Sequence, residues 1–475
     1  MVPARRTNRR GSIHVAEPAA SQAFDILILG GGSAGYAAAL RSAELGFSVA
    51  LVEKGKLGGT CLHNGCIPTK ALLHSAEIAE NAKTAAKYGV KASFESIDMP
   101  AVNAYKDGII AGKFRGLTGL IKSKGITVIE GEGKLTGQDT VTVDGTAYTG
   151  KNIILATGSY SRSLPGLEIT GNKVITSDHA LTMDTLPKKA LVLGGGVIGC
   201  EFASVWNSFG VDVTIIEALP SLVPNEDAAI VKQLERAFKK RKIDFNTGTR
   251  FAGVEENENG VKATLEDGKT FEADLLLVAV GRGPVTANLG FEDAGLTMDR
   301  GYVITNERLH TGVGNIYAVG DIVPGLQLAH RGFQQGIFVA EEIAGKKPVV
   351  VEDVNIPKVT YCEPEIASVG LTEAKAKEKF GDDAVTIQEY NLAGNGKTSI
   401  LGSAGLIKLV RQADGPIVGV HMIGARMGEQ VGEAQLIVNW EAFPEDVASL
   451  VHAHPTQNEA LGEAAMALAG KPLHG

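Results

Sequence analysis

Cysteine is scarce in this chain, and the scarcity limits what its thiols can do. Only 4 of the 475 residues are cysteines, which is too few for the disulfide scaffold of a small secreted protein. The resting thiols are therefore expected to be reduced, and we expect a cytoplasmic protein. Any disulfide that does form is then expected to be catalytic rather than structural.

Two further absences restrict the partners of the chain. No run of about 18 or more apolar residues predicts a membrane span, and a net charge of -8 supplies no basic field for nucleic acid. With 44% hydrophobic and 21% charged residues, the composition is that of a globular protein, and the length suits about three domains of ordinary size. Neither a membrane nor a nucleic acid is therefore expected as a partner.

The N-terminal segment is rich in arginine but lacks an apolar stretch. Arg5, Arg6, Arg9 and Arg10 lie within residues 1–23, and without apolar residues behind them they do not predict a secretory signal. A transit peptide is the alternative interpretation. We favour a disordered extension over 1–23, because a polar, arginine-rich segment cannot bury a core.

A glycine-rich loop follows the first expected strand. Gly30, Gly32 and Gly35 match G-x-G-x-x-G, in which the glycines permit a tight turn, close approach of a pyrophosphate and close packing of the next helix. The next strand, expected over 48–52, is followed by Glu53, where a ribose hydroxyl would need an acceptor. Together these features predict a dinucleotide site rather than a simple tight turn.

The same device recurs after a strand expected over 190–193. Its glycines are Gly194, Gly196 and Gly199, and Glu217 closes the following strand. No arginine comes directly after Glu217 to receive a 2′-phosphate, which favours NAD over NADP. A duplicated fold with one empty site is the alternative, but the intact glycines and both acidic ends argue against it.

Three further apolar strands end in glycines, within 152–159, 274–284 and 315–321. Such strand ends are where ligands bind in open α/β sheets. Asp321 could accept a hydrogen bond from a ligand hydroxyl or could cap a turn. An amphipathic helix is expected over 327–344, and the pattern after it predicts an α+β terminal domain.

Two histidines lie close together near the C-terminus. On an extended segment His452 and His454 would share a face, which leaves a metal pair conceivable, but no third ligand follows at a useful spacing. One imidazole could instead be an acid or base oriented by a carboxylate such as Glu459. Structural histidines with satisfied hydrogen bonds are the equally open alternative.

The segment GGTCLHNGCIPTK contains Cys61 and Cys66. A regular helix rises about 1.5 Å per residue and would hold their Cα atoms beyond the roughly 7 Å that a disulfide tolerates. A disulfide therefore requires an irregular turn, which Gly65 and Pro68 are expected to supply.

A metal site at these thiols lacks donors. His63 is a single additional donor, and Cys200 and Cys362 lie far away in the sequence and are expected to be buried structural thiols. The thiol pair instead follows the first nucleotide unit directly. A flavin there could exchange two electrons with a dithiol and with a nicotinamide, so FAD is expected in the first unit and NAD in the second, with no metal.

On these motifs the chain resembles the pyridine nucleotide-disulfide oxidoreductases. The resemblance spans 24–475 through GGTCLHNGCIPTK, GGGVIGCE, AVGD and HAHPTQNEA in that order. It implies an α/β fold with two Rossmann-like dinucleotide-binding domains, for FAD and NAD, and a C-terminal α+β dimerisation domain. After the extension, it implies an FAD-binding domain over 24–160 and 287–350, an NAD-binding domain over 161–286 and an interface domain over 351–475.

Within that family the chain is most similar to the branch, of actinobacterial type, that oxidises protein-bound dihydrolipoamide as the E3 component of 2-oxo acid dehydrogenase complexes. The resemblance implies that electrons pass to a Cys61–Cys66 disulfide and then through FAD to NAD⁺. Cys61 would exchange with the lipoyl sulfur, and Cys66 would face the flavin. Lys70 would approach the flavin N5 region and pair with Glu201.

The resemblance also implies a homodimer that receives dihydrolipoamide from a lipoylated acyltransferase, E2. His454, oriented by Glu459, would deprotonate the substrate thiol from across the subunit interface. FAD contacts are expected at Gly30, Gly32, Gly35, Glu53, Thr60, Lys70, Gly133, Ala156, Thr157, Gly158, Asp321, Leu328, Ala329 and His330. NAD contacts are expected at Gly194, Gly196, Val197, Ile198, Gly199, Glu201, Glu217, Phe251 and Gly281.

Other activities within the same family predict different sequence features. Glutathione-type reductases usually carry arginines after the second nucleotide strand, and mercuric reductases add a C-terminal cysteine pair, whereas this chain has no cysteine after Cys362. One departure from many relatives is the lack of an asparagine after the proline in GRGPVT, 281–286. Another disulfide or quinone reductase and a non-catalytic docking component remain the alternatives, although the latter would predict eroded catalytic positions.

Overall fold

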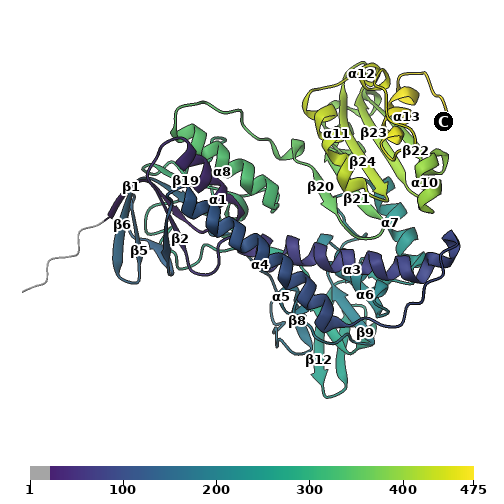
Figure 1. The fold of residues 1–475 in the computed structure, drawn as a ribbon, viewed down its shortest axis with the longest axis horizontal. Helices are drawn as coiled ribbons and strands as arrows, with labels where there is room; N and C mark the ends of the chain where they lie inside the picture. The colour runs from purple at the N-terminus through teal and green to yellow at the C-terminus, as the bar shows by residue number, and fades with distance from the viewer. Residues whose placement is uncertain (1–21, 475) are drawn as a thin grey trace, which may run out of the picture.

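Three main sheets organise residues 22–474, which are the part of the chain that this computed structural model describes (Figure 1). Two of them contain parallel strands and glycine-rich turns, and the third is antiparallel, so the predicted fold class is confirmed. Most of the expected extension lies outside the described residues. Its last two residues, Gln22 and Ala23, belong to the first strand and pair with Tyr148 and Thr149, and the domain boundary at residue 24 remains a prediction.

The first sheet has seven strands. Five of them run parallel, and two antiparallel strands extend one side. Ile26, Leu27 and Ile28 in the central strand are fully buried, as expected for a parallel strand that is covered on both faces. In spatial order the strands are β3 (Thr127–Glu130), β2 (Val49–Glu53), β1 (Gln22–Leu29), β6 (Thr146–Leu155), β5 (Thr140–Val143) and β4 (Gly133–Leu135), with β19 (Ile316–Ala318) paired to β6.

Two helices from distant parts of the chain pack together over this sheet: α1 (Ser33–Glu44) and α8 (Ala329–Ile343) (Figure 1). A Cβ at Gly336 would lie 2.3 Å from the backbone oxygen of Ala34, so the helices approach backbone to backbone. The long helix α4 (Met99–Ser123) contributes the buried side chain of Ile121 to the same core. The segment after residue 315 thus returns to the sheet that the N-terminal segment begins.

The second sheet has five parallel strands, in the order β11 (Asp244–Thr247), β10 (Asp212–Glu217), β9 (Lys189–Leu193), β15 (Leu275–Val278) and β8 (Val174–Thr176). Beside it lies an antiparallel meander of β12 (Phe251–Asn257), β13 (Gly260–Leu265) and β14 (Thr270–Ala273). The helices of this second unit are α5 (Ser177–Ala180), α6 (Val197–Ser208) and α7 (Ala228–Lys240). The helix α3 (Cys66–Thr84) packs on α6 and shares its buried core, so the thiol segment contacts both nucleotide units.

The third sheet is antiparallel and lies at the C-terminal end of the chain (Figure 1). Its strands, in spatial order, are β20 (Lys358–Thr360), β21 (Glu365–Gly370), β24 (Ile417–Gly424), β23 (Leu406–Gln412) and β22 (Val385–Asn391). Its helices are α9 (Glu373–Phe380), α10 (Gly396–Leu401), α11 (Met427–Asn439), α12 (Pro444–Ala448) and α13 (Glu459–Leu468). Lys408 Nζ lies 2.9 Å from Asp227 Oδ1 at the start of α7, and this buried ion pair docks the sheet on the second unit.

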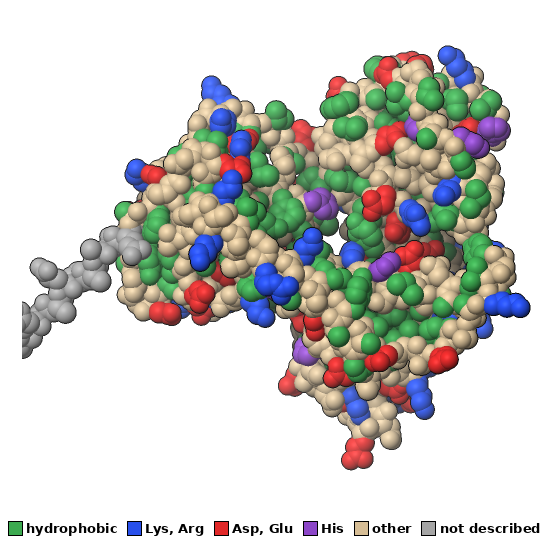
Figure 2. Space-filling view, in the orientation of Figure 1, with side chains coloured by type: hydrophobic (Ala, Val, Ile, Leu, Met, Phe, Trp, Pro, Cys, Tyr) green, Lys and Arg blue, Asp and Glu red, His purple; other side chains and the backbone are tan. Residues whose placement is uncertain are grey.

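Charged side chains of both signs are interspersed over the face drawn in Figure 2. None of the helices within 22–474 is long and apolar enough to cross a membrane.

Short elements connect the three units. The remaining elements are α2 (Gly59–His63), η1 (Ala85–Tyr88), β7 (Ser159–Ser161), β16 (Arg282–Pro284), β17 (Met298–Asp299), β18 (Tyr302–Val303), η2 (Gly320–Ile322), η3 (Asp353–Asn355), η4 (Asp382–Ala384) and η5 (Leu392–Gly394).

Candidate active site

Cys61 and Cys66 lie on either side of a break between two helices. Helix α2 ends at His63 and α3 begins at Cys66, with Gly65 at φ -148° and ψ -111° between them. This break is the irregular turn that the thiol spacing requires. Pro68 does not bend the turn, contrary to expectation, because it lies in the first turn of α3, where a backbone N–H has no intrahelical partner. Both thiols are free and partly exposed.

The two thiols differ in acidity. A hydrogen bond from Cys61, followed by the charge of Lys70, lowers the pKa of the Cys66 thiol to about 7, although burial acts in the opposite direction. The same hydrogen bond, together with burial, raises the pKa of Cys61, and a hydrogen bond from Ser33 offsets only part of this rise. Cys66 is also the first residue of α3, and a helix N-terminus favours a thiolate. The negative charge of the pair therefore resides on Cys66.

A partly buried ion pair lies one helical turn beyond Cys66. Lys70 Nζ is 2.9 Å from each carboxylate oxygen of Glu201 in α6, and the backbone N–H of Tyr361 donates to the same carboxylate at 3.0 Å. The ammonium also lies 4.7 Å from the centre of the Tyr361 ring. Burial lowers the pKa of Lys70, but the charge of Glu201 and the hydrogen bond to it outweigh burial and raise that pKa. Lys70 therefore remains a cation beside the thiols.

His454 and Glu459 form a hydrogen-bonded pair near the C-terminus. His454 Nδ1 lies 2.8 Å from Glu459 Oε1, and the other carboxylate oxygen accepts from the backbone N–H of Thr456 at 2.7 Å. Burial raises the pKa of Glu459, but these two hydrogen bonds outweigh it and lower that pKa. The His454 side chain is 78% exposed, and the neighbouring Leu450 and Val451 are also exposed. The exposed imidazole thus follows two exposed apolar residues in the sequence.

His452 has a separate carboxylate partner. Its Nε2 lies 2.8 Å from Glu433 Oε1 in α11, and this hydrogen bond raises the pKa of His452. A Cβ at Gly462 would lie 2.6 Å from His452 Nδ1, so the ring is tightly packed. The two histidines therefore serve different carboxylates rather than one metal. Within 22–474, no group of three or more histidine, cysteine, aspartate or glutamate side chains is arranged to hold a metal ion.

The two glycine-rich turns have the same geometry. A Cβ at Gly35 would lie 1.8 Å from the oxygen of Gly30, and a Cβ at Gly199 would lie 1.9 Å from the oxygen of Gly194. No side chain can be accommodated at such distances, so each helix packs on its turn only because glycine is present. In each unit the N-terminus of the helix thereby stays close to the end of the strand, where backbone N–H groups can bind a pyrophosphate.

The glutamates at the ends of β2 and β10 make equivalent hydrogen bonds in the two units. Glu53 accepts from the backbone N–H of Gly31 at 2.7 Å, and Glu217 accepts from that of Gly195 at 2.6 Å. Each carboxylate also accepts a second backbone N–H, and a carboxylate has about four lone-pair sites in all. Each therefore retains acceptor capacity for ribose hydroxyls, and both units fit a dinucleotide.

A polar network connects several residues expected at the flavin. Ser159 Oγ donates to Asp321 Oδ2 at 2.5 Å and accepts from Arg282 Nε at 2.7 Å. Arg282 Nη2 also donates to the backbone oxygen of Ser159 at 2.7 Å and to Thr60 Oγ1 at 3.4 Å. Because Thr60 directly precedes Cys61 in α2, Arg282 links this helix, through Ser159, to the carboxylate of Asp321.

The other expected FAD contacts are distributed over both ends of the first unit. Thr157 Oγ1 donates to the oxygen of Val285 at 2.5 Å, and Gly158 has φ +77°. His330 Nε2 lies 2.8 Å from the oxygen of Pro357, so that ring is engaged by the backbone. Gly133 begins β4, Ala156 follows β6, and Leu328 and Ala329 lie at the start of α8.

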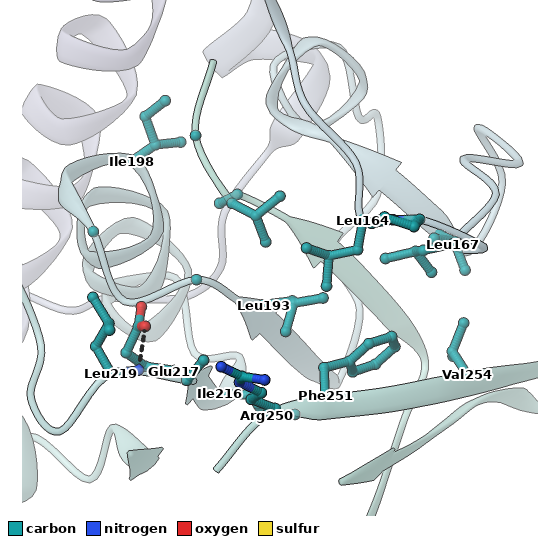
Figure 3. Close-up of a pocket in the computed structure, with 18 of the residues that line it drawn as sticks. Leu164, Leu167, Leu193, Ile198, Ile216, Glu217, Leu219, Arg250, Phe251 and Val254 are labelled. Atoms are coloured by element: carbon teal, nitrogen blue, oxygen red, sulfur yellow. Dashed lines mark hydrogen bonds between the residues drawn. The ribbon is translucent and has the colours of Figure 1, made fainter. Parts of the chain in front are cut away.

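A cavity of about 1350 Å³ lies at the carboxyl ends of the strands in the second sheet (Figure 3). Two residues expected at NAD are absent from its lining: Gly199 packs on its own turn, and Glu201 is bonded to Lys70. Leu328, for which an FAD contact is predicted, also lines this cavity. The expected NAD residues that do line it are Gly194, Gly196, Val197, Ile198, Glu217, Phe251 and Gly281.

Several residues of the site were not identified from the sequence. Ser33 lies inside the first glycine motif and Ser159 ends the segment 152–159, but neither motif predicts a role for the hydroxyl. Tyr361 contributes a backbone N–H that any residue except proline would supply. Arg282 lies within GRGPVT, but this motif does not predict its contacts with Ser159 and Thr60. Arg250 also lines the cavity, and the only available signal was its position just before the strand that contains Phe251.

Family models match nearly the whole chain. Residues 24–336 match a model described as "Pyridine nucleotide-disulphide oxidoreductase", and residues 356–465 match the dimerisation domain of the same group. The chain is 40% identical over 465 residues to "Dihydrolipoyl dehydrogenase, mitochondrial" of Pisum sativum, covering 95% of this chain and 92% of that protein. It is also 40% identical over 471 residues to a dihydrolipoyl dehydrogenase of Bacillus subtilis (strain 168), covering 95% and 99%.

Solved structures agree with this relationship. LpdA from Mycobacterium tuberculosis superposes with a TM-score of 0.87 at 26% identity, covering 94% of this chain and 99% of that chain. The HOCl-induced flavoprotein disulfide reductase RclA from Escherichia coli superposes with a TM-score of 0.83 at 27% identity, again covering 94% and 99%. The matched dimerisation domain supports a homodimer. The chain therefore belongs to the pyridine nucleotide-disulphide oxidoreductase family, as an enzyme that uses FAD and NAD and is similar over nearly its whole length to the dihydrolipoyl dehydrogenases.

Proposed function

We propose that the enzyme oxidises protein-bound dihydrolipoamide to lipoamide and passes the electrons to NAD⁺, as the E3 component of 2-oxo acid dehydrogenase complexes. The observation that carries the proposal is the thiol pair of Cys61 and Cys66, in which the negative charge is confined to one sulfur. In such a pair Cys66 is the better leaving thiolate, so a substrate thiol is expected to attack Cys61. The relatives named dihydrolipoyl dehydrogenase support this substrate, and a lipoylated acyltransferase, E2, is the partner in that role.

The steps of thiol exchange can be assigned to side chains of the protein. His454, held by Glu459, removes the proton from one thiol of dihydrolipoamide. The resulting thiolate attacks Cys61 in the Cys61–Cys66 disulfide, and Cys66 leaves as a thiolate. The second substrate thiol then displaces Cys61, which closes the lipoyl disulfide and leaves Cys61 as a thiol with the second proton. Two electrons have then passed from the substrate to the cysteine pair.

Cys66 is suited to be the leaving thiol. A thiol of lower pKa leaves faster in disulfide exchange, and Cys61, Lys70 and the start of α3 all stabilise its thiolate. Lys70 is fixed for this purpose by Glu201, since both carboxylate oxygens contact its ammonium. Bound FAD supplies a two-electron acceptor that connects the dithiol to NAD⁺.

The proposed base belongs to the other subunit of a homodimer. Within one chain, the other side chains with a main effect on the acidity of the thiols are Ser33, Lys70 and Glu201. The exposed imidazole and its apolar neighbours are instead suited to contact with a second chain. Figure 2 shows further hydrophobic side chains on the drawn face of the C-terminal domain.

A second candidate is the reduction of another disulfide or of a quinone. Relatives include "Leghemoglobin reductase" of Glycine max at 39% identity over 463 residues, and RclA is described as a flavoprotein disulfide reductase. These names show that related chains have been assigned other substrates. A non-catalytic docking component is disfavoured because Cys61, Cys66, His454 and Glu459 are all present.

Steady-state formation of NADH from dihydrolipoamide tests the proposal. The flavin-loaded dimer is expected to turn over with NAD⁺, whereas Cys61→Ser, which removes the attacked sulfur, is expected to be inactive. Cys362→Ser is the matched control, because Cys362 is a buried cysteine outside the thiol pair. Absence of turnover by the wild-type dimer, with NADPH-dependent reduction of another disulfide instead, would overturn the assignment.

A further inference from the structure

An arginine from a distant segment lies at the Glu217 end of the cavity. Strand pairing places Glu217, the last residue of β10, opposite Thr247 at the end of β11. Beyond the strands, the backbone N–H of Gly248 donates to the oxygen of Leu219 at 2.8 Å. These contacts hold the segment that leads to Arg250 beside the turn that follows Glu217, and both side chains line the cavity (Figure 3).

The guanidinium of Arg250 is available to a ligand. It forms no ion pair or side-chain hydrogen bond with any residue in the described part of the chain, and the side chain is exposed. Glu256 also lines the cavity, but it accepts from Thr170 Oγ1 at 2.8 Å. Glu266 contacts Arg250 through the backbone, since its N–H donates to the backbone oxygen of Arg250 at 2.9 Å. This hydrogen bond does not involve the guanidinium. An arginine without a carboxylate partner can bind a phosphate through two hydrogen bonds.

The acidic end of the cavity is where the adenosine ribose of a dinucleotide is expected. The carboxylate of Glu217 accepts from ribose hydroxyls and repels a 2′-phosphate. Arg250 has the opposite preference, because a guanidinium gains little from a neutral hydroxyl and much from a phosphate. The two residues therefore oppose each other at one end of the cavity.

We propose that Arg250 is a second specificity-determining residue at the 2′ position of the adenosine ribose: it favours a 2′-phosphate, and the charge of Glu217 opposes it and supplies the preference for NAD. The inference rests on the NAD site of the proposed function and adds a determinant to it. Removing the charge of Glu217 is then sufficient to admit NADP⁺, without introducing any arginine. The sequence favours NAD because no arginine directly follows Glu217, but the fold supplies one from the next strand connection.

Four variants separate the two residues. Glu217→Gln removes the charge and keeps a carbonyl oxygen for the N–H of Gly195, and Glu217→Ser is a second charge-free variant in case the first folds poorly. Arg250→Gln and the double variant Glu217→Gln with Arg250→Gln remove the guanidinium. Arg300→Gln is the control, because Arg300 is an exposed arginine in the β17–β18 turn and does not line the cavity.

Isothermal titration calorimetry of the flavin-loaded dimer with NAD⁺ and with NADP⁺ gives the readout without any lipoyl substrate. Glu217→Gln is expected to bind NADP⁺ about ten to a hundred times more tightly than the wild type, the range for a charge-assisted contact to phosphate. The double variant is expected to lose this gain. Arg250→Gln alone is expected to change the Kd for NAD⁺ less than about threefold, and Arg300→Gln to change neither Kd.

Two results would overturn the proposal. One is an unchanged gain in NADP⁺ affinity in the double variant, and the other is no gain in either charge-free variant that still binds NAD⁺. These results are distinct from failure of the proposed function. A wild-type dimer that binds NAD⁺ but does not oxidise dihydrolipoamide would refute that function and leave the role of Arg250 intact.

Discussion

Cys66 is expected to be ionised at a pH where an ordinary cysteine is not. With a pKa of about 7 it is half ionised at pH 7, whereas a thiol at the ordinary value of 9.0 is about 1% ionised at that pH. A thiolate beside an oxidised flavin gives a long-wavelength absorbance. In a Cys61→Ser variant, Cys66 cannot form its disulfide, so this absorbance can be titrated directly and is expected to have a midpoint near pH 7. Cys66→Ser is expected to abolish the absorbance.

The cause of the lowered pKa can be tested in the same titration. The Cys61 thiol contributes the largest lowering and Lys70 the next favourable one. Replacing Cys61 by alanine removes the hydrogen bond that serine retains, so the midpoint of Cys61→Ala is expected to be higher than that of Cys61→Ser. Adding Lys70→Met to Cys61→Ser removes a nearby cation and is expected to raise the midpoint by about one pH unit or more.

Lys83→Met in the same Cys61→Ser background is the matched control. Lys83 lies on the same helix, and 13 residues at about 1.5 Å each place it roughly 20 Å along the helix axis from Lys70. Its replacement is expected to leave the midpoint unchanged. A midpoint near pH 9 in Cys61→Ser, or an equal rise in Lys70→Met and Lys83→Met, would refute the assignment of the thiolate to Cys66 and Lys70.

Three further changes have defined outcomes. Glu459→Gln removes the charge that orients its imidazole partner and is expected to lower kcat for dihydrolipoamide about a hundredfold; an unchanged kcat would contradict the role of the pair. Gly35→Ala is expected to prevent FAD retention after gel filtration, whereas Gly112→Ala, in the middle of α4 with no atom within 4 Å of the added Cβ, retains it. Because Glu433 raises the pKa of His452 above 6.5, their pair stabilises the fold below about pH 6.5 and loses this contribution as pH rises through the higher folded pKa. Glu433→Gln is therefore expected to lower the Tm more at pH 6 than at pH 9, and an equal loss at both would exclude this linkage.

The features that were predictable from the sequence are those fixed by local chemistry. The glycine turns at Gly30 and Gly194 could be located because each follows a short apolar run and precedes a helical pattern within a few residues. The break before Cys66 could be inferred because a regular helix is incompatible with a disulfide at this spacing. The pairing of Lys70 with Glu201, in contrast, came only from the resemblance to a family, because nothing local connects two residues on different helices.

The features that escaped prediction depend on strand register. Arg250 reaches the cavity because β10 and β11 pair so that Glu217 lies opposite Thr247, and the sequence does not specify which strands are neighbours. Arg282 meets Ser159 because β16 pairs with β7 in an antiparallel register. The role of Pro68 was misassigned for a different reason, since its tolerance within the first turn of a helix makes it uninformative about the preceding bend. The domain boundaries and the actinobacterial type remain predictions.

The exposed imidazole of His454 has a genetic consequence. If each site combines Cys61 of one chain with His454 of the other, a chain defective in the thiol and a chain defective in the imidazole can complement each other. A mixed dimer contains one site with both defects and one site with neither. If the two chains mix at random, about half of the dimers contain one chain of each kind. About a quarter of all active sites would then be intact, although each parental chain alone forms only inactive dimers. Alleles of this gene would then show intragenic complementation, and a heterozygous cell could retain a function that both of its alleles lack.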